Sequence, residues 1–226
     1  MRWDRAGSLP FVLGGSTTPA VKALLIANVA VFLFQTLARS LVQVRIESTF
    51  GLVPFEVVHH LYVWQLATYM FLHGGLMHIG FNMLALWWIG APVEQYLGRA
   101  RYFGLYLVAG LAGSAGALVF SPNVPTLGAS GAIFGILGAM LILEWQATGR
   151  LGGNAMTLIV INLALSFALA NISIGGHIGG LIGGTLAAII LVELPDRLRI
   201  PRTVALVLAS AIGVVAVAGA IAVSAT

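Results

Sequence analysis

Residues 127–147 read LGASGAIFGILGAMLILEWQA, an apolar stretch long enough to cross a bilayer as a helix, with Ser130 near its start. A second apolar stretch, GHIGGLIGGTLAAIILVEL at residues 176–194, has His177 near its start. A hydroxyl and an imidazole therefore occupy the same ends of two predicted membrane spans. This arrangement indicates a nucleophile and its base held inside a bilayer.

The whole chain has the composition of a membrane protein. Of its 226 residues, 59% are hydrophobic and 8% are charged, and the mean hydropathy is +1.00. A soluble domain of this length cannot bury so much apolar surface. No linker divides the chain, so we predict one all-α, polytopic helix bundle. It has seven transmembrane helices, at residues 20–38, 75–95, 102–120, 129–147, 155–173, 176–194 and 203–224.

The basic residues predict the orientation of this bundle. With a cytoplasmic N-terminus and a short cytoplasmic tail at residues 1–19, nine of the 11 Lys and Arg residues fall inside: Arg2, Arg5, Lys22, Arg99, Arg101, Arg150, Arg197, Arg199 and Arg202. Only Arg39 and Arg45 fall outside, as the positive-inside rule requires. The positive charge thus sets topology, and no nucleic-acid partner is expected. The outer connection, residues 39–74, is expected to lie partly in the membrane interface.

This orientation places four polar side chains in the outer half of the membrane, near the starts of three predicted helices: His78, Asn82, Ser130 and His177. Ser130 and His177 meet if the fourth and sixth helices touch. Both helices carry the small-residue spacing that permits close approach, with Gly131, Gly135 and Gly138 on one and Gly176, Gly180 and Gly184 on the other. The alternative is that Ser130 only belongs to a small-residue packing stretch.

Acyl transfer also needs donors for an oxyanion. The Ser130 N–H, at a helix start, is one candidate, and His78 with Asn82 on one helix face supplies two more. The alternative for this pair is a hydrogen-bonded helix contact. Metal binding and cofactors are not expected, because the chain has no Cys and the outer halves of the spans have no carboxylate. For the same reason a Ser-His dyad is predicted, with Asn162 and Ser166 as hydrogen-bond formers facing the bundle.

At these residues the chain resembles the rhomboid family of intramembrane serine proteases. The resemblance covers about residues 45–195 and rests on WQLATYMFLH at 64–73, His78, Asn82, Val93-Glu94, Leu97-Gly98, Gly128-Ala129-Ser130-Gly131, His177, Gly180 and Gly184. It implies that Ser130 is the nucleophile and His177 the general base and acid. It further implies that His78, Asn82 and the Gly128 segment form the oxyanion site, with Phe134, Gly180 and Gly184 in support.

The resemblance also implies a six-helix protease core at residues 20–195, with 203–226 as an added C-terminal helix. Substrates would be transmembrane segments of other proteins, entering beside the fifth helix. Two positions depart from a well-known bacterial pattern: Gln65 stands in place of Arg, and Phe134 in place of Tyr. The first removes a salt bridge and the second a hydroxyl, but neither removes a catalytic group.

Two other classes of protein remain as alternatives. A catalytically silent, rhomboid-like protein would bind membrane helices without cutting them, and such proteins are expected to lack the Ser or the His. A channel or transporter would place polar residues across the whole membrane, whereas here they lie in one leaflet. The expected location is a bacterial plasma membrane, with the site opening to the extracytoplasmic side. The oligomeric state is left open.

Overall fold

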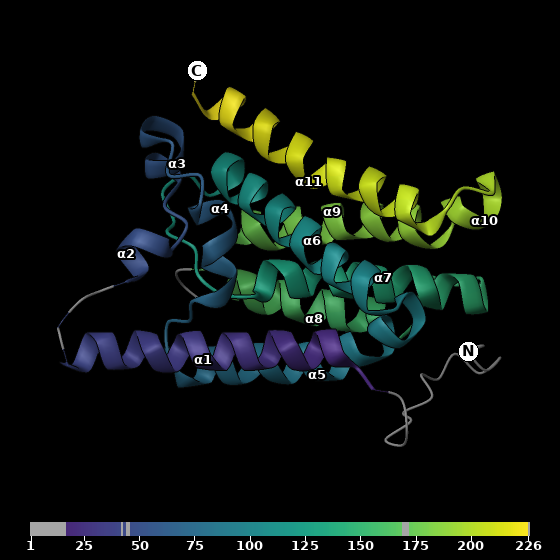
Figure 1. Cartoon of the computed structure of the whole chain (residues 1–226), viewed down its shortest axis with the longest axis horizontal. Coiled ribbons are helices and arrows are strands. Elements are labelled where there is room, and N and C mark those ends of the chain that lie inside the picture. Colours follow the sequence, from purple (N-terminus) through teal and green to yellow (C-terminus); the bar gives the residue numbers. More distant parts are fainter. Residues whose placement is uncertain (1–16, 42, 44–45, 169–171, 226) are drawn as a thin grey trace.

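The computed structural model describes residues 17–41, 43, 46–168 and 172–225, and these residues fold as a bundle of helices (Figure 1). The elements are α1 (Pro19–Leu41), α2 (Glu47–Phe50), α3 (Pro54–His60), α4 (Gln65–Thr68), the 3₁₀ helix η1 (Tyr69–Phe71), α5 (Leu76–Leu97), α6 (Arg99–Phe120), α7 (Ser130–Thr148), α8 (Asn154–Ala168), α9 (Ile174–Val192), α10 (Leu194–Leu198) and α11 (Arg202–Ser224). The all-α membrane bundle predicted from the sequence is confirmed. The expected tail at residues 1–19 lies mostly outside the described residues.

Within the described residues, six helical stretches are long and apolar enough to cross a membrane: α1, α5, α6, α7, α9 continuing into α10, and α11. The span expected at 155–173 differs. There the structure has α8, an apolar helix of 15 residues, and residues 169–171 of the expected span lie outside the described part. About 20 residues are needed to cross the hydrocarbon core, so the 15 described residues of α8 do not by themselves make a full span.

The centre of the bundle is formed by α6, α7 and α9, which approach each other through glycine. A Cβ added to Gly180 would overlap the carbonyl oxygen of Gly131, and one on Gly184 would overlap the Cα of Gly135. Between α6 and α9, a Cβ on Gly179 would stand 2.9 Å from the Cα of Gly116. These backbones touch with no side chain between them, which is the packing that membrane helices achieve with small residues.

The other long helices lie on the two sides of this centre. Figure 1 shows α1 beside α5 along one edge and α11 crossing the opposite edge over α6 and α9. The Glu94 carboxylate on α5 accepts hydrogen bonds from the backbone N–H groups of Ala20, at 2.9 Å, and Val21, at 2.7 Å. These N–H groups start α1 and have no partner within their own helix. Glu94 therefore caps α1 and fixes it to α5.

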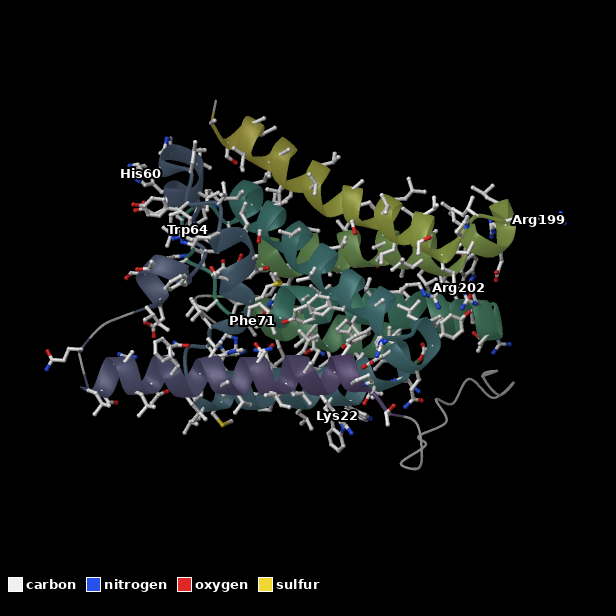
Figure 2. The ribbon with its side chains drawn as sticks, viewed as in Figure 1. Lys22, His60, Trp64, Phe71, Arg199 and Arg202 are labelled. Atoms are coloured by element: carbon white, nitrogen blue, oxygen red, sulfur yellow. The ribbon has the colours of Figure 1, made fainter. Side chains whose placement is uncertain are left out.

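The connection before α5 folds into α2, α3, α4 and η1 at one end of the bundle. A single antiparallel bridge between Leu52 and Thr126 joins it to the segment that leads into α7. Figure 2 shows His60 and Trp64 at this end, and Arg199 and Arg202 at the opposite end. Large apolar side chains of the connection are exposed: Phe55, Leu61, Tyr62, Val63 and Trp64. Their exposure agrees with the expected position in the membrane interface.

Candidate active site

The site begins with two helix starts that the central glycines bring together. Ser130 is the first residue of α7, and His177 lies in the first turn of α9. The Ser130 Oγ and the His177 Nε2 are 2.7 Å apart. The imidazole is buried, with 9% of its surface exposed. The hydroxyl and the imidazole that the sequence places at matching ends of two helices are therefore in hydrogen-bond contact.

The start of α9 is held in place by two serines. The Ser173 Oγ accepts the N–H of Gly176 at 3.2 Å and so caps the helix. The Ser121 Oγ, just after α6, accepts the N–H of Gly175 at 3.1 Å. Two N–H groups that would lack an intrahelical partner are satisfied, and the turn that carries His177 is tied to the end of α6.

The ring of Phe134 packs on the imidazole of His177. Their centroids are 4.5 Å apart and their planes are inclined by 27°, so the rings are stacked. Phe134 lies one helical turn after Ser130, so α7 supplies both the hydroxyl and the surface beneath the ring. The stacking survives without the hydroxyl of a Tyr, because it depends on the ring face alone.

The second nitrogen of His177 meets a side chain that the sequence did not assign to the site. Its Nδ1 lies 2.7 Å from the Oγ of Ser166 on α8. Ser166 was expected only as a hydrogen-bond former facing the bundle. From sequence alone, the rotation of α8 about its axis decides which polar group Ser166 meets. A Ser placed four residues after Asn162 is the one signal that marks this face as polar.

His78 and Asn82 lie against the backbone that precedes Ser130. A Cβ added to Gly128 would stand 2.6 Å from the His78 Nε2 and 3.6 Å from the Asn82 Nδ2. Gly128 has φ +111°, which also favours glycine there. The structure thus places His78 and Asn82, the expected oxyanion residues, beside Gly128, which precedes Ser130 by two positions in the sequence.

The proton positions on this pair favour donation toward Gly128. The His78 Nδ1 accepts the N–H of Gly74 at 3.3 Å, so in the neutral ring the proton is on Nε2. Asn82 uses its Nδ2 once, toward the carbonyl of His78 at 3.0 Å, and a second amide proton is available. Two donors therefore lie beside the Gly128 turn, in addition to the Ser130 N–H.

The segment around α4 and η1 supports this turn. The Tyr69 carbonyl accepts the N–H of Gly128 at 2.9 Å, and the Tyr69 hydroxyl donates to the carbonyl of Gly110 at 2.9 Å. Burial raises the pKa of Tyr69 to about 12, against the lowering effect of Ser114, so the hydroxyl stays a donor. The tyrosine links the loop before α7 to α6.

Gln65, the residue that departs from the Arg pattern, is fully buried and uses both ends of its amide. Its Oε1 accepts the N–H of Val53 at 3.0 Å, and its Nε2 donates to the carbonyl of Thr49 at 3.2 Å. These neutral hydrogen bonds join α4 to α2 and to the segment that follows it. The loop is therefore held without a salt bridge at this position.

His73 lies between η1 and α5, with its ring 5.1 Å from that of His78. It is 1% exposed. Burial, together with the neighbouring His78, lowers the pKa of His73 from 6.5 to about 4, and a backbone hydrogen bond with Phe71 opposes the shift. His73 is therefore neutral at physiological pH.

The buried carboxylates of the long helices are used away from this site. Glu94 caps α1, as described above, and the Glu144 carboxylate accepts the N–H of Ala155 at 3.0 Å near the start of α8. Glu193 pairs with Arg197 at 2.7 Å. In the described structure the partner of the His177 Nδ1 is therefore the hydroxyl of Ser166 rather than a carboxylate.

Comparison with known proteins places this chain in a family. The family model described as the rhomboid domain matches residues 60–194. The chain is 48% identical over 119 residues to Rhomboid protease GluP of Bacillus subtilis (strain 168), covering 51% of this chain and 23% of GluP. It is 33% identical over 139 residues to Putative rhomboid protease YdcA of the same strain, covering 59% of this chain and 70% of YdcA. Over 79 residues it is 37% identical to Inactive RHOMBOID-like protein 8 of Arabidopsis thaliana, covering 35% of this chain and 22% of that protein.

Proposed function

Because the chain belongs to the rhomboid family, we propose that it is an intramembrane serine endopeptidase that uses Ser130 and His177 as a catalytic dyad. The observation that carries the proposal is the 2.7 Å contact between the Ser130 Oγ and the His177 Nε2 at the starts of two membrane helices. An ionisable side chain in a membrane span is costly and marks a functional site by default. A hydroxyl beside a neutral imidazole is the arrangement of an activated nucleophile.

In the proposed reaction the Ser130 Oγ attacks the carbonyl carbon of the scissile peptide, and its proton passes to the His177 Nε2. The intermediate collapses when the imidazolium returns this proton to the leaving amine, which breaks the C–N bond. Water then attacks the acyl-serine with His177 as base. The carboxylate product leaves and Ser130 recovers its proton.

The negative oxygen of the intermediate needs donors close to Ser130. The Ser130 N–H, the His78 Nε2–H and the free amide proton of Asn82 converge on the Gly128 turn, as described above. Donors fixed before the reaction lower the barrier without reorganising when the charge forms. We therefore assign the oxyanion site to His78, Asn82 and the backbone at Gly128 and Ser130.

The proposed substrates are other membrane proteins, cut in or near a transmembrane segment. The chain is an integral membrane protein, and its site lies at the end of the bundle that holds α2, α3 and α4. With the basic residues on the cytoplasmic side, this end faces out of the cell. The proposed location is a bacterial plasma membrane, and Phe134, Gly180 and Gly184 support the site without joining the chemistry.

The test is cleavage by the pure protein in proteoliposomes, with a tagged single-span substrate and the cut mapped by mass spectrometry. Ser130→Ala and His177→Ala are each expected to abolish cleavage, and Ser130→Ala also labelling by a fluorophosphonate. Ser210→Ala is the matched control, because Ser210 lies on α11 and donates to the carbonyl of Leu206 in its own helix. Turnover near the wild-type rate in Ser130→Ala would contradict the proposed mechanism.

A catalytically silent relative is the second candidate, because one matched protein bears the name Inactive RHOMBOID-like protein 8. The same assay separates the two candidates. Binding of a membrane helix with no cleavage, and no fluorophosphonate labelling of Ser130, would favour the silent protein. The presence of both Ser130 and His177 at hydrogen-bond distance favours the protease.

A further inference from the structure

We propose that Ser166 is a positioning residue, whose hydroxyl accepts the Nδ1–H of His177 and keeps the Nε2 lone pair directed at Ser130. The inference rests on the proposed function, since it concerns the base of that same site. Three side chains then act in one line, from Ser130 through His177 to Ser166, with both links at 2.7 Å. The third member lies on α8, a helix that contributes neither nucleophile nor base.

The direction of each hydrogen bond follows from counting protons. The Ser166 Oγ donates its single proton to the carbonyl of Asn162, at 2.7 Å. With that proton used, Ser166 offers only lone pairs to the imidazole. The His177 Nδ1 must therefore carry the proton of the neutral ring. Its Nε2 is left unprotonated and can accept the proton of Ser130.

The surroundings make this the arrangement that the buried ring keeps. Ser166 is 3% exposed, so water has little access to replace its oxygen. Phe134 stacks on the imidazole, and a ring flip would break that stacking or both hydrogen bonds. Asn162, whose carbonyl fixes Ser166, donates its own Nδ2 to the carbonyl of Leu158 at 2.8 Å. The backbone of α8 thus orients the Ser166 hydroxyl, and this hydroxyl orients the ring of His177.

A hydroxyl performs part of the task that a carboxylate performs in a triad. It selects the tautomer and presents negative electron density to the imidazolium that forms when Ser130 loses its proton. It carries no full charge, so it does not add a buried ion to the membrane. A neutral partner for His177 is consistent with the use of the buried carboxylates Glu94 and Glu144, which cap other helices away from this site.

The position of the acceptor on α8 links the base to a helix with an exposed apolar face. Of the described residues of α8, several large apolar side chains are exposed: Val160, Ile161, Leu165 and Phe167. A movement of α8 by about 1 Å would lengthen the Ser166–His177 hydrogen bond beyond its normal range. The ability of His177 to accept the Ser130 proton therefore depends on the position of α8 relative to α9.

The experiment combines a spectroscopic readout with kinetics on the full chain in detergent micelles. ¹⁵N NMR of histidine-labelled protein distinguishes a protonated from an unprotonated ring nitrogen, and His177→Ala identifies the His177 signals. We expect wild type to show the Nδ1–H tautomer alone, and Ser166→Ala to show a mixture that includes the Nε2–H form. For cleavage, Ser166→Ala should lower kcat on the order of 10-fold, with little change in KM, because one neutral hydrogen bond is lost.

Two further variants keep the proposal open to refutation. Ser210→Ala removes a hydroxyl that makes the same bond to the carbonyl four residues earlier, and it should change neither the spectrum nor kcat. Ser166→Cys nearly keeps the size of the side chain but offers a weaker acceptor, and it replaces Ser166→Ala if that variant does not fold. Its fraction of the Nε2–H tautomer of His177 should be smaller than in Ser166→Ala. A single Nδ1–H tautomer in both Ser166 variants would overturn the proposal. The spectra need no turnover, so they decide this question even if the protein cleaves nothing.

Discussion

At the scale of single residues, the site is built from neutral groups. A hydroxyl, an imidazole, an amide and backbone N–H groups make its contacts, and Gln65 holds the neighbouring loop with an uncharged amide. Inside a membrane each unpaired charge costs several kcal/mol, so neutral donors and acceptors give direction at lower cost. Mutations here should therefore change the reaction more than the fold.

Asn82→Ala tests the proposed oxyanion site. Because one donor is removed, kcat should fall on the order of 10² to 10³-fold, whereas the fluorophosphonate should still label Ser130. Asn154→Ala, at the exposed start of α8, is the matched control and should cleave at the wild-type rate. Normal cleavage by Asn82→Ala would support the alternative in which His78 and Asn82 only join helices.

His73 predicts how stability depends on pH. The folded pKa is about 4 and the unfolded pKa is about 6.5, so between these values the unfolded chain binds more protons. The free energy of unfolding should therefore decrease as the pH falls from about 6.5 to about 4, by roughly 1 to 3 kcal/mol, and this part should level off below. Thermal unfolding in micelles at stepped pH values measures the effect.

The control for this prediction is a second histidine. His73→Leu should make the decrease between pH 6.5 and 4 smaller, because one buried ring is removed, while the buried ring of His177 remains in both proteins. His59→Leu, exposed on α3, should leave the wild-type dependence intact. A decrease of unchanged size in His73→Leu would assign the whole effect to other groups.

At the scale of elements, glycine spacing predicted the central contact correctly. Gly180 and Gly184 meet Gly131 and Gly135, and these four belong to the two sets of glycines that were expected to let the helices of His177 and Ser130 approach. The length of α8 could not be predicted in the same way. Residues 155–173 are apolar to within a few positions of His177, so hydropathy predicts a full-length span there, whereas the described part of α8 has 15 residues. The contact between Ser166 and His177 could not be predicted from the sequence either, because it depends on the depth and rotation of α8.

Gly180→Ala tests the contact between α7 and α9. The new Cβ would overlap the Gly131 carbonyl, so the backbones must separate, and a shift of about 1 Å in the base can cost roughly 10²-fold in rate. Gly219→Ala on α11 is the matched control, because a Cβ there meets nothing within 4 Å. Equal activity of the two variants in proteoliposomes would show that the alignment of Ser130 and His177 tolerates the separation.

At the scale of the whole molecule, charge distribution predicts the orientation in the membrane. Figure 2 shows Arg199 and Arg202 at the end away from His60 and Trp64, and Arg101 and Arg202 line a cavity there of about 240 Å³. Arg2, Arg5 and Arg45, which entered the prediction of orientation, lie outside the described residues. The positive end is expected in the cytoplasm, which leaves the Ser130 end outside.

Single cysteines can test this orientation, since the natural chain has none and provides the blank. Val63, at the Ser130 end, is 52% exposed, and Leu198, on α10 at the other end, is 64% exposed, so each is replaced by Cys in turn. A maleimide that cannot cross membranes should label Val63→Cys in intact cells, and Leu198→Cys only after permeabilisation. The reverse labelling would place the site in the cytoplasm.

The cap that Glu94 provides for α1 has a consequence for the order of synthesis. Ala20 and Val21 leave the ribosome more than 70 residues before the carboxylate that accepts their N–H groups. Until α5 has entered the bilayer, the N–H groups at the start of α1 lack this acceptor, and afterwards the Glu94 carboxylate that accepts them is buried. The start of α1 thus depends on α5 for its acceptor, and the Glu94 carboxylate depends on α1 for its donors. A nascent chain interrupted before Glu94 holds α1 without the contact that fixes its depth.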